Sequence, residues 1–206
     1  MKSTIIESTI LIALFLILMS CKTTPTPEPV TPPSQVVTEF QKFMLNEVNF
    51  LRTKPVEYAE LRLREYYDRI ADNGSYLVLK SLTPMNALVF NYSLNKSATE
   101  YAGLMAEKNL TAHDTETLKR AINAGYTGTS VSENIAADIK DIYNATINPE
   151  SAAIGFVRLM IIDEGVADLG HRVILINPNY KTLGIGFGRN TASTYINYTV
   201  QVFGYQ

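Results

Sequence analysis

The sequence predicts one α+β domain, with helices first and paired strands last. Apolar residues recur at helical spacing through much of the chain from residue 36 to residue 165. Two strand patterns close the chain, over 181–189 and 194–204. Helices followed by paired strands favour an α+β fold over a parallel α/β sheet. The length from residue 36 to residue 206 suits a single domain.

The first helix is predicted over residues 36–54. Its apolar residues recur at helical spacing: Val37, Phe40, Met44, Val48 and Leu51. Pro55 interrupts the pattern, which resumes over 56–72 and stops at Asn73-Gly74, a turn signal.

The clearest helix is predicted over residues 91–109. One face of it is apolar and consists of Leu94, Ala98, Tyr101, Ala102 and Met105. A loop with His113 follows, and a further helix is predicted over 114–125, closed by Gly125. Residues 130–138 have a strand-like but ambiguous pattern.

A helix over residues 148–165 has signals at both ends. Asn148 is placed as its N-cap, Pro149 as its first helical residue and Gly165 just past its end. The two strands that follow are expected to form a closing hairpin. "GIGFG" (184–188) lies within the first of them, so its glycines predict close backbone packing and not a phosphate-binding loop.

The N-terminus has the pattern of a bacterial lipoprotein signal. The apolar run "ILIALFLILM" (10–19) is too short to span a bilayer as a helix but fits a secretory signal. "LMSC" resembles a lipobox, which places lipid on Cys21, the only cysteine. We therefore expect a signal peptide over 1–20, a proline-rich linker over 21–35 and a folded domain over 36–206.

Charge and motifs exclude several function classes. The formal net charge is −2 and the chain has no basic stripe, so no nucleic-acid partner is expected. The sequence contains no H-E-x-x-H, no Cys/His cluster, no G-x-S-x-G and no phosphate-cradling glycine motif.

Two acids at the end of the 148–165 helix need an explanation. Asp163 and Glu164 lie at a helix C-terminus, where carboxylates are disfavoured by roughly 0.3–1 kcal/mol. A nearby cation would offset this cost: Arg172, a protonated His171 or a metal. Solvated acids at a frayed helix end remain the alternative. The two histidines, His113 and His171, are 58 residues apart, and this spacing alone is weak evidence for a shared site.

An ordered set of segments resembles one family. The set includes "LNEVNFLRTKP" (45–55), "AHD" (112–114), "SENIA" (132–136), "IIDEGVADLGHRVILINPNYKTLGIGFG" (161–188) and "YTVQVFG" (198–204). In this order they resemble the CAP superfamily of cysteine-rich secretory, antigen 5 and pathogenesis-related 1 proteins. The resemblance covers about residues 40–204.

The resemblance implies a three-layer α-β-α sandwich with a central antiparallel sheet and a cleft lined by two histidines and two acids. The residues that match are His113, His171 and Glu133. Glu164 is favoured as the second acid, with Asp163 as its rival. The sequence departs from a bacterial-type pattern at Glu164 and Leu169, and Phe156 stands where a tryptophan is common. The cysteine-rich extension of some relatives is absent.

Three functions are open at this point. The favoured one is a binding or interaction module, lipid-anchored in the bacterial cell envelope at the outer membrane or cell surface. Its cleft would hold a divalent ion such as zinc or magnesium, a lipid or a protein partner. The second is a metal-dependent hydrolase with Glu133 or Glu164 as general base. The third is a purely structural polar network.

Overall fold

The computed structural model describes residues 36–67 and 74–205. The predicted signal peptide, Cys21 and the proline-rich linker lie outside these residues. Residues 35–206 form one compact unit. Within 36–67 and 74–205, no helix is long and apolar enough to cross a membrane.

A four-stranded sheet forms the centre of this unit. Its strands are β1 (Val89–Phe90), β2 (Val131–Asp138), β3 (Thr182–Arg189) and β4 (Asn197–Gly204), in the order β1-β3-β4-β2. β4 pairs antiparallel with β3 and with β2 along its whole length. The prediction of an antiparallel sheet is confirmed for the three long strands, whereas the short β1 pairs parallel with β3.

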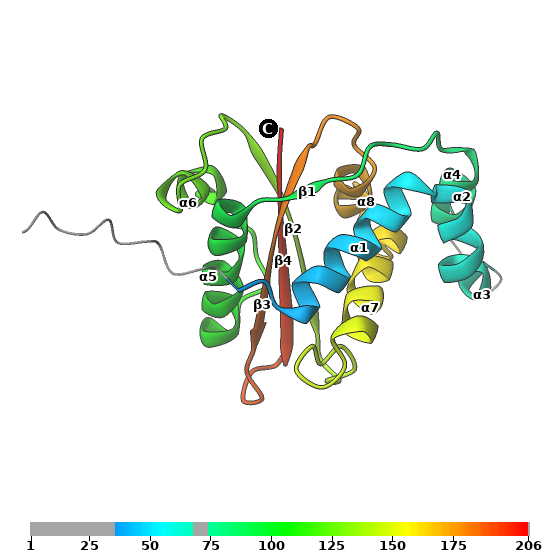
Figure 1. The fold of residues 1–206 in the computed structure, drawn as a ribbon. Coiled ribbons are helices and arrows are strands. Elements are labelled where there is room, and N and C mark those ends of the chain that lie inside the picture. The colour runs from blue at the N-terminus through cyan, green and yellow to red at the C-terminus, as the bar shows by residue number, and fades with distance from the viewer. Residues whose placement is uncertain (1–35, 68–73, 206) are drawn as a thin grey trace, which may run out of the picture. The chain divides into compact units, whose positions relative to one another are not determined.

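Helices cover both faces of the sheet (Figure 1). α5 (Tyr92–Lys108) and α6 (Thr117–Asn123) lie on one side. On the other side lie α1 (Glu39–Thr53), α7 (Pro149–Ile162) and α8 (Gly170–Leu175). The α+β class and its α-β-α layering are therefore as predicted.

Shorter helical elements follow α1. They are α2 (Pro55–Tyr58), the π-helical η1 (Ala59–Leu63), α3 (Arg64–Tyr67) and α4 (Gly74–Ser81). The sequence pattern predicts helix from residue 56 onward but not α4, since Asn73-Gly74 is a turn signal. It does not predict α8 as a separate helix either.

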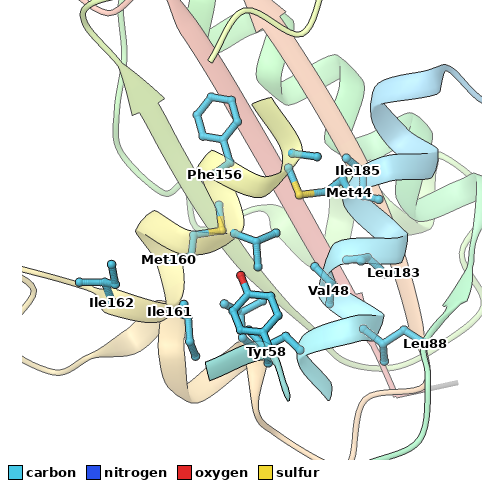
Figure 2. Packing of buried hydrophobic residues seen from close by; sticks show 14 of the residues in the cluster. Met44, Val48, Tyr58, Leu88, Phe156, Met160, Ile161, Ile162, Leu183 and Ile185 are labelled. Carbon is cyan, nitrogen blue, oxygen red and sulfur yellow. The ribbon is translucent and has the colours of Figure 1, made fainter. Parts of the chain in front are cut away.

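The core on the α1 and α7 side is the larger of the two (Figure 2). Met44 and Val48 of α1 face Phe156 and Met160 of α7, and β3 contributes Leu183 and Ile185 to the same cluster; all six are buried. The two helices begin where the sequence caps them. Thr38 and Gln41 form a capping box for α1, and the Asn148 side chain accepts from Ser151 N–H at the start of α7.

The core on the α5 side depends on glycines of β3. A Cβ on Gly186 would lie 2.0 Å from the carbonyl oxygen of Ala98, and a Cβ on Gly184 or Gly188 would meet the α5 backbone at 2.1 Å. Only glycine allows the helix this close to the strand. The predicted role of "GIGFG" in close backbone packing is confirmed.

The order of the strands decides where a site can form. β2 is an edge strand, so one of its long sides is not covered by another strand. The loop after α5, which carries His113, and the turn between α7 and α8 both reach this edge.

Candidate functional site

His113 and Glu133 form the first of two imidazole–carboxylate pairs. Glu133 lies in β2, and Nδ1 of His113 is 3.0 Å from its Oε1. The Glu133 side chain is 3% exposed and that of His113 is 49% exposed. The carboxylate is therefore fixed inside the fold, while the imidazole reaches solvent.

Arg120 of α6 holds the other side of the Glu133 carboxylate. Its Nη2 donates to Glu133 Oε2 at 2.7 Å and its Nε donates to Asp114 Oδ2 at 3.0 Å. Its guanidinium lies 3.9 Å from the ring centroid of Tyr101, whose hydroxyl donates to the Ala112 carbonyl at 2.6 Å. Burial, and then the nearby Asp114 and Glu133, raise the pKa of Tyr101. Arg120 thus links α5, α6, β2 and the His113 loop.

Sequence reasoning missed Arg120. It lies in the middle of a predicted helix and belongs to no motif, so nothing in the pattern separates it from a solvated face. Only the packing of α6 against β2 brings it to Glu133.

His171 and Asp163 form the second pair. Asp163 is the C-cap of α7, in the left-handed region at φ 57°, and its Oδ1 lies 2.6 Å from Nδ1 of His171. Its Oδ2 accepts from the backbone N–H of Arg172 at 3.1 Å. One carboxylate therefore orients the imidazole and also satisfies a free N–H group in the first turn of α8.

The cation expected at this helix end is Arg172. Its Nε and Nη2 donate to the carbonyls of Ile161 and Ile162, at 3.0 Å and 2.6 Å. These carbonyls belong to the last turn of α7, where the helix dipole is negative. The buried guanidinium thus offsets the cost of placing Asp163 there.

The structure places Asp163, and not the favoured Glu164, in hydrogen-bond contact with His171. Asp163 is buried against the imidazole, whereas Glu164 is exposed in the turn that follows. The left-handed C-cap at Asp163 ends the helix, so the next side chain points elsewhere. The two acids are adjacent in sequence, but only the carboxylate of Asp163 is buried.

Both histidines line one cavity. A hollow of about 540 Å³ is lined by His113, Glu133, His171 and the β2 segment 134–137. A neighbouring hollow of about 780 Å³ shares part of β2 and His171 with it, and is also lined by Asp163, Glu164 and Arg158. Of the four residues predicted to share one cluster, His113 and Glu133 form one pair. His171 pairs with Asp163, the rival of the predicted Glu164, and both pairs lie around a continuous groove.

Comparison with known protein families identifies the family of this chain. The model of the CAP cysteine-rich secretory protein family matches residues 45–203. The chain belongs to the CAP family. No curated protein matches the chain in a direct sequence search.

Two solved structures are similar to this chain. An outer surface protein from Borrelia burgdorferi is 19% identical, with 82% of this chain and 94% of that chain covered and a TM-score of 0.47. NaASP2, solved with Zn²⁺, is 14% identical, with 84% of this chain and 83% of that chain covered and a TM-score of 0.50. At 14% identity the likeness to NaASP2 concerns the fold alone.

The groups of the cleft that could hold a metal are its two imidazoles. Within the described residues, no three His, Cys, Asp or Glu side chains come together as a metal site. The expected four-ligand cluster is therefore not formed. Each imidazole instead directs Nδ1 to a carboxylate, and neither Nε2 has a hydrogen-bond partner among the described residues. That is the usual state of a metal-binding histidine, whose other ring nitrogen donates to a carboxylate.

Proposed function

We propose that this CAP domain is a binding module whose cleft holds a divalent ion through Nε2 of His113 and Nε2 of His171. The observation that supports this is the pairing of both Nδ1 atoms with buried carboxylates, beside one cavity. Such pairing fixes the tautomer and leaves Nε2 available to bind a metal. Imidazole ligands favour zinc over magnesium, which prefers oxygen.

Two protein ligands leave the remaining positions of a tetrahedral ion open. Those positions would be filled by water or by a group of the bound partner. The chain's own residues hold and orient the imidazoles, and the groove along β2 supplies the surrounding surface. This arrangement suits binding of a partner that contributes a ligand of its own.

The alternative function, a metal-dependent hydrolase, receives less support. A general base needs a carboxylate that is free to take a proton from water. Both oxygens of Glu133 are engaged, one by His113 and one by Arg120. Glu164, the other candidate base, is exposed, and the carboxylate bonded to His171 is that of Asp163.

We further propose that the module is anchored in the cell envelope through lipid on Cys21. The apolar run, the lipobox-like "LMSC" and the proline-rich segment support this. The test is metabolic labelling with a fatty-acid analogue followed by membrane fractionation. The wild type should carry label and sediment with membranes, and Cys21→Ser should do neither. Equal labelling of both would overturn the anchor.

Calorimetric titration tests the metal site. Residues 35–206 are suitable because they form a compact unit with their own hydrophobic cores. Zinc should bind the wild type more tightly than magnesium does. His113→Ala and His171→Ala should each weaken zinc binding, whereas the matched Glu164→Gln should leave it unchanged. A folded wild type that binds no zinc would refute the proposal.

A further inference from the structure

The groove runs along the outer edge of β2. The residues of β2 that line the two hollows are Glu133, Asn134, Ile135, Ala136 and Ala137, five in succession. Successive side chains of a strand point to opposite faces of the sheet. Ile135 packs with the α5-side core and Ala136 with the α7-side core. A hollow lined by both kinds of residue must lie against the edge of the strand and not over one face.

The backbone along this edge has no partner strand. β2 pairs with β4 on its inner side, and the sheet order places no strand on its outer side. Alternate N–H and C=O groups of an edge strand point outward. In the described part of the chain, no backbone or side-chain group outside the sheet bonds the backbone of residues 132–137.

Three devices that often protect an edge strand are missing from β2. Natural edges commonly carry lysine, proline or a bulge. Residues 131–138 contain neither lysine nor proline, and each residue from 131 to 138 pairs in unbroken register with β4. Protection comes instead from the two walls of the groove. One wall is the loop with Thr111, Ala112 and His113. The other is the turn with Val166 together with His171 at the start of α8.

One end of the groove carries a cation. Arg158 of α7 lines the hollow that lies along Ile135–Ala137. Its guanidinium stacks on Tyr66 at 4.7 Å from the ring centroid and reaches Glu65 only at 3.9 Å. At 3.9 Å the Arg158–Glu65 pair is too long for a hydrogen bond. The guanidinium of Arg158 therefore has N–H groups that can still donate to a ligand.

We propose that this groove binds an extended peptide segment of another protein, which pairs with the outer edge of β2 and places an acidic residue at Arg158. The proposal rests on the binding function proposed above and names the class of partner. Unpaired backbone groups recognise another backbone, since only a strand offers N–H and C=O groups at the same spacing. Five strand residues at about 3.3 Å each give a contact length of roughly 16 Å.

A second copy of this chain fits the groove poorly. β2 lies at the floor of a hollow, between the two walls. The β2 strand of a second copy would carry the same walls, which would collide before the two edges met. A slender peptide has no such walls.

The test uses a fluorescent peptide of sequence TVTVTVE and residues 35–206 of the protein. Its control is the depsipeptide with the same side chains, in which esters replace the amides and remove the N–H donors. The amide peptide should bind about tenfold more tightly than the ester version. Hydrogen exchange of the amides in 131–138 should slow when the peptide is bound. Equal binding of the two versions, no binding, or protection elsewhere would overturn the proposal.

Two variants locate the peptide. Arg158→Glu should weaken binding of TVTVTVE about tenfold and favour the matched peptide TVTVTVK. Ala137→Lys should block the groove and abolish peptide binding. Circular dichroism should show that this variant is folded. If it is not, Val166→Lys, on the wall of the groove, replaces it in the test. Unchanged affinity in folded variants would contradict this placement. Sedimentation measures whether the protein forms dimers. A dimer that the peptide does not dissociate would overturn the peptide proposal and indicate that two copies pair through β2.

Zinc titration of the same samples separates the two proposals. Arg158→Glu should bind zinc like the wild type, because Arg158 does not line the hollow that the two imidazoles share. Peptide binding without zinc binding would refute the metal site and leave the groove standing. Zinc binding without peptide binding would refute the groove alone.

Discussion

Oδ1 of Asp163 lies 2.6 Å from Nδ1 of His171, across the turn that joins α7 to α8. The same carboxylate accepts the N–H of Arg172 through Oδ2. Asp163 therefore ends one helix, starts the next and orients an imidazole of the cleft. Asp163 therefore has a structural role and a role in the proposed binding site. Its contacts hold α8 in place, and they also fix the direction of Nε2 of His171.

Asp163→Ala should lower the free energy of unfolding by about 2 kcal/mol, because a buried cap and its partners are lost. The adjacent Glu164→Ala is its matched control and should change stability by less than about 0.5 kcal/mol. Urea unfolding of both variants measures the difference. Similar losses in the two variants would contradict the assignment of Asp163 as the paired acid.

Arg120→Ala should destabilise the fold by about 3 kcal/mol, because the buried Glu133 carboxylate loses its charged partner. Lys119→Ala removes the neighbouring cation of the same helix, which pairs with Glu116 on the surface. This control should cost less than about 1 kcal/mol. Thermal unfolding compares the two variants, and an Arg120→Ala protein as stable as the control would show that Glu133 does not depend on Arg120.

Gly186→Ala should destabilise the protein by about 2–3 kcal/mol, because its Cβ would lie 2.0 Å from the Ala98 carbonyl oxygen. Gly103→Ala in α5 is the control, since a Cβ there meets nothing within 4 Å. It should stabilise the helix by about 0.5–1 kcal/mol. Chemical denaturation distinguishes the two, and opposite signs are the expected outcome. A stabilising Gly186→Ala would contradict the close packing of α5 on β3.

Asp141→Asn should reduce stability in a pH-dependent way. Hydrogen bonds from Arg189 and then Asn197 lower the pKa of Asp141. A carboxyl with a lowered pKa in the folded state contributes stability above its unfolded pKa of about 4 and loses it as pH falls through the folded value. Asn tolerates the left-handed backbone of this position, φ 53°. The difference in Tm between variant and wild type should therefore be full at pH 7 and shrink below pH ~4. A difference that is constant down to acid pH would refute this role.

The sequence predicted the layers and the strands well because their signals are local. Helical spacing in α5, the caps of α7 and the glycines of β3 each depend on a few neighbouring residues. The short β1 and α8 were missed because tertiary contacts stabilise them. α8 begins at a left-handed Leu169 without a side-chain cap of its own, and Asp163, nine residues before Arg172, supplies the acceptor.

The candidate site could be predicted only in part. His113, Glu133 and His171 were named because each matches a family motif, and the structure brings all three to one hollow. The choice between Asp163 and Glu164 depended on a left-handed C-cap, which leaves no mark in the sequence. Arg120 could not be predicted for a different reason. Its role arises from the packing of α6 against β2, and no motif in the sequence connects these two segments.

The most direct test of the central claim is the long-range ¹H–¹⁵N spectrum of the histidine rings, recorded on residues 35–206 with and without zinc. The chain has two histidines, so each ring nitrogen can be assigned. We predict that both Nδ1 atoms carry a proton before and after zinc is added, and that both Nε2 resonances shift when zinc binds. Rings protonated at Nε2, or zinc-dependent shifts at Nδ1 or at neither nitrogen, would contradict the account.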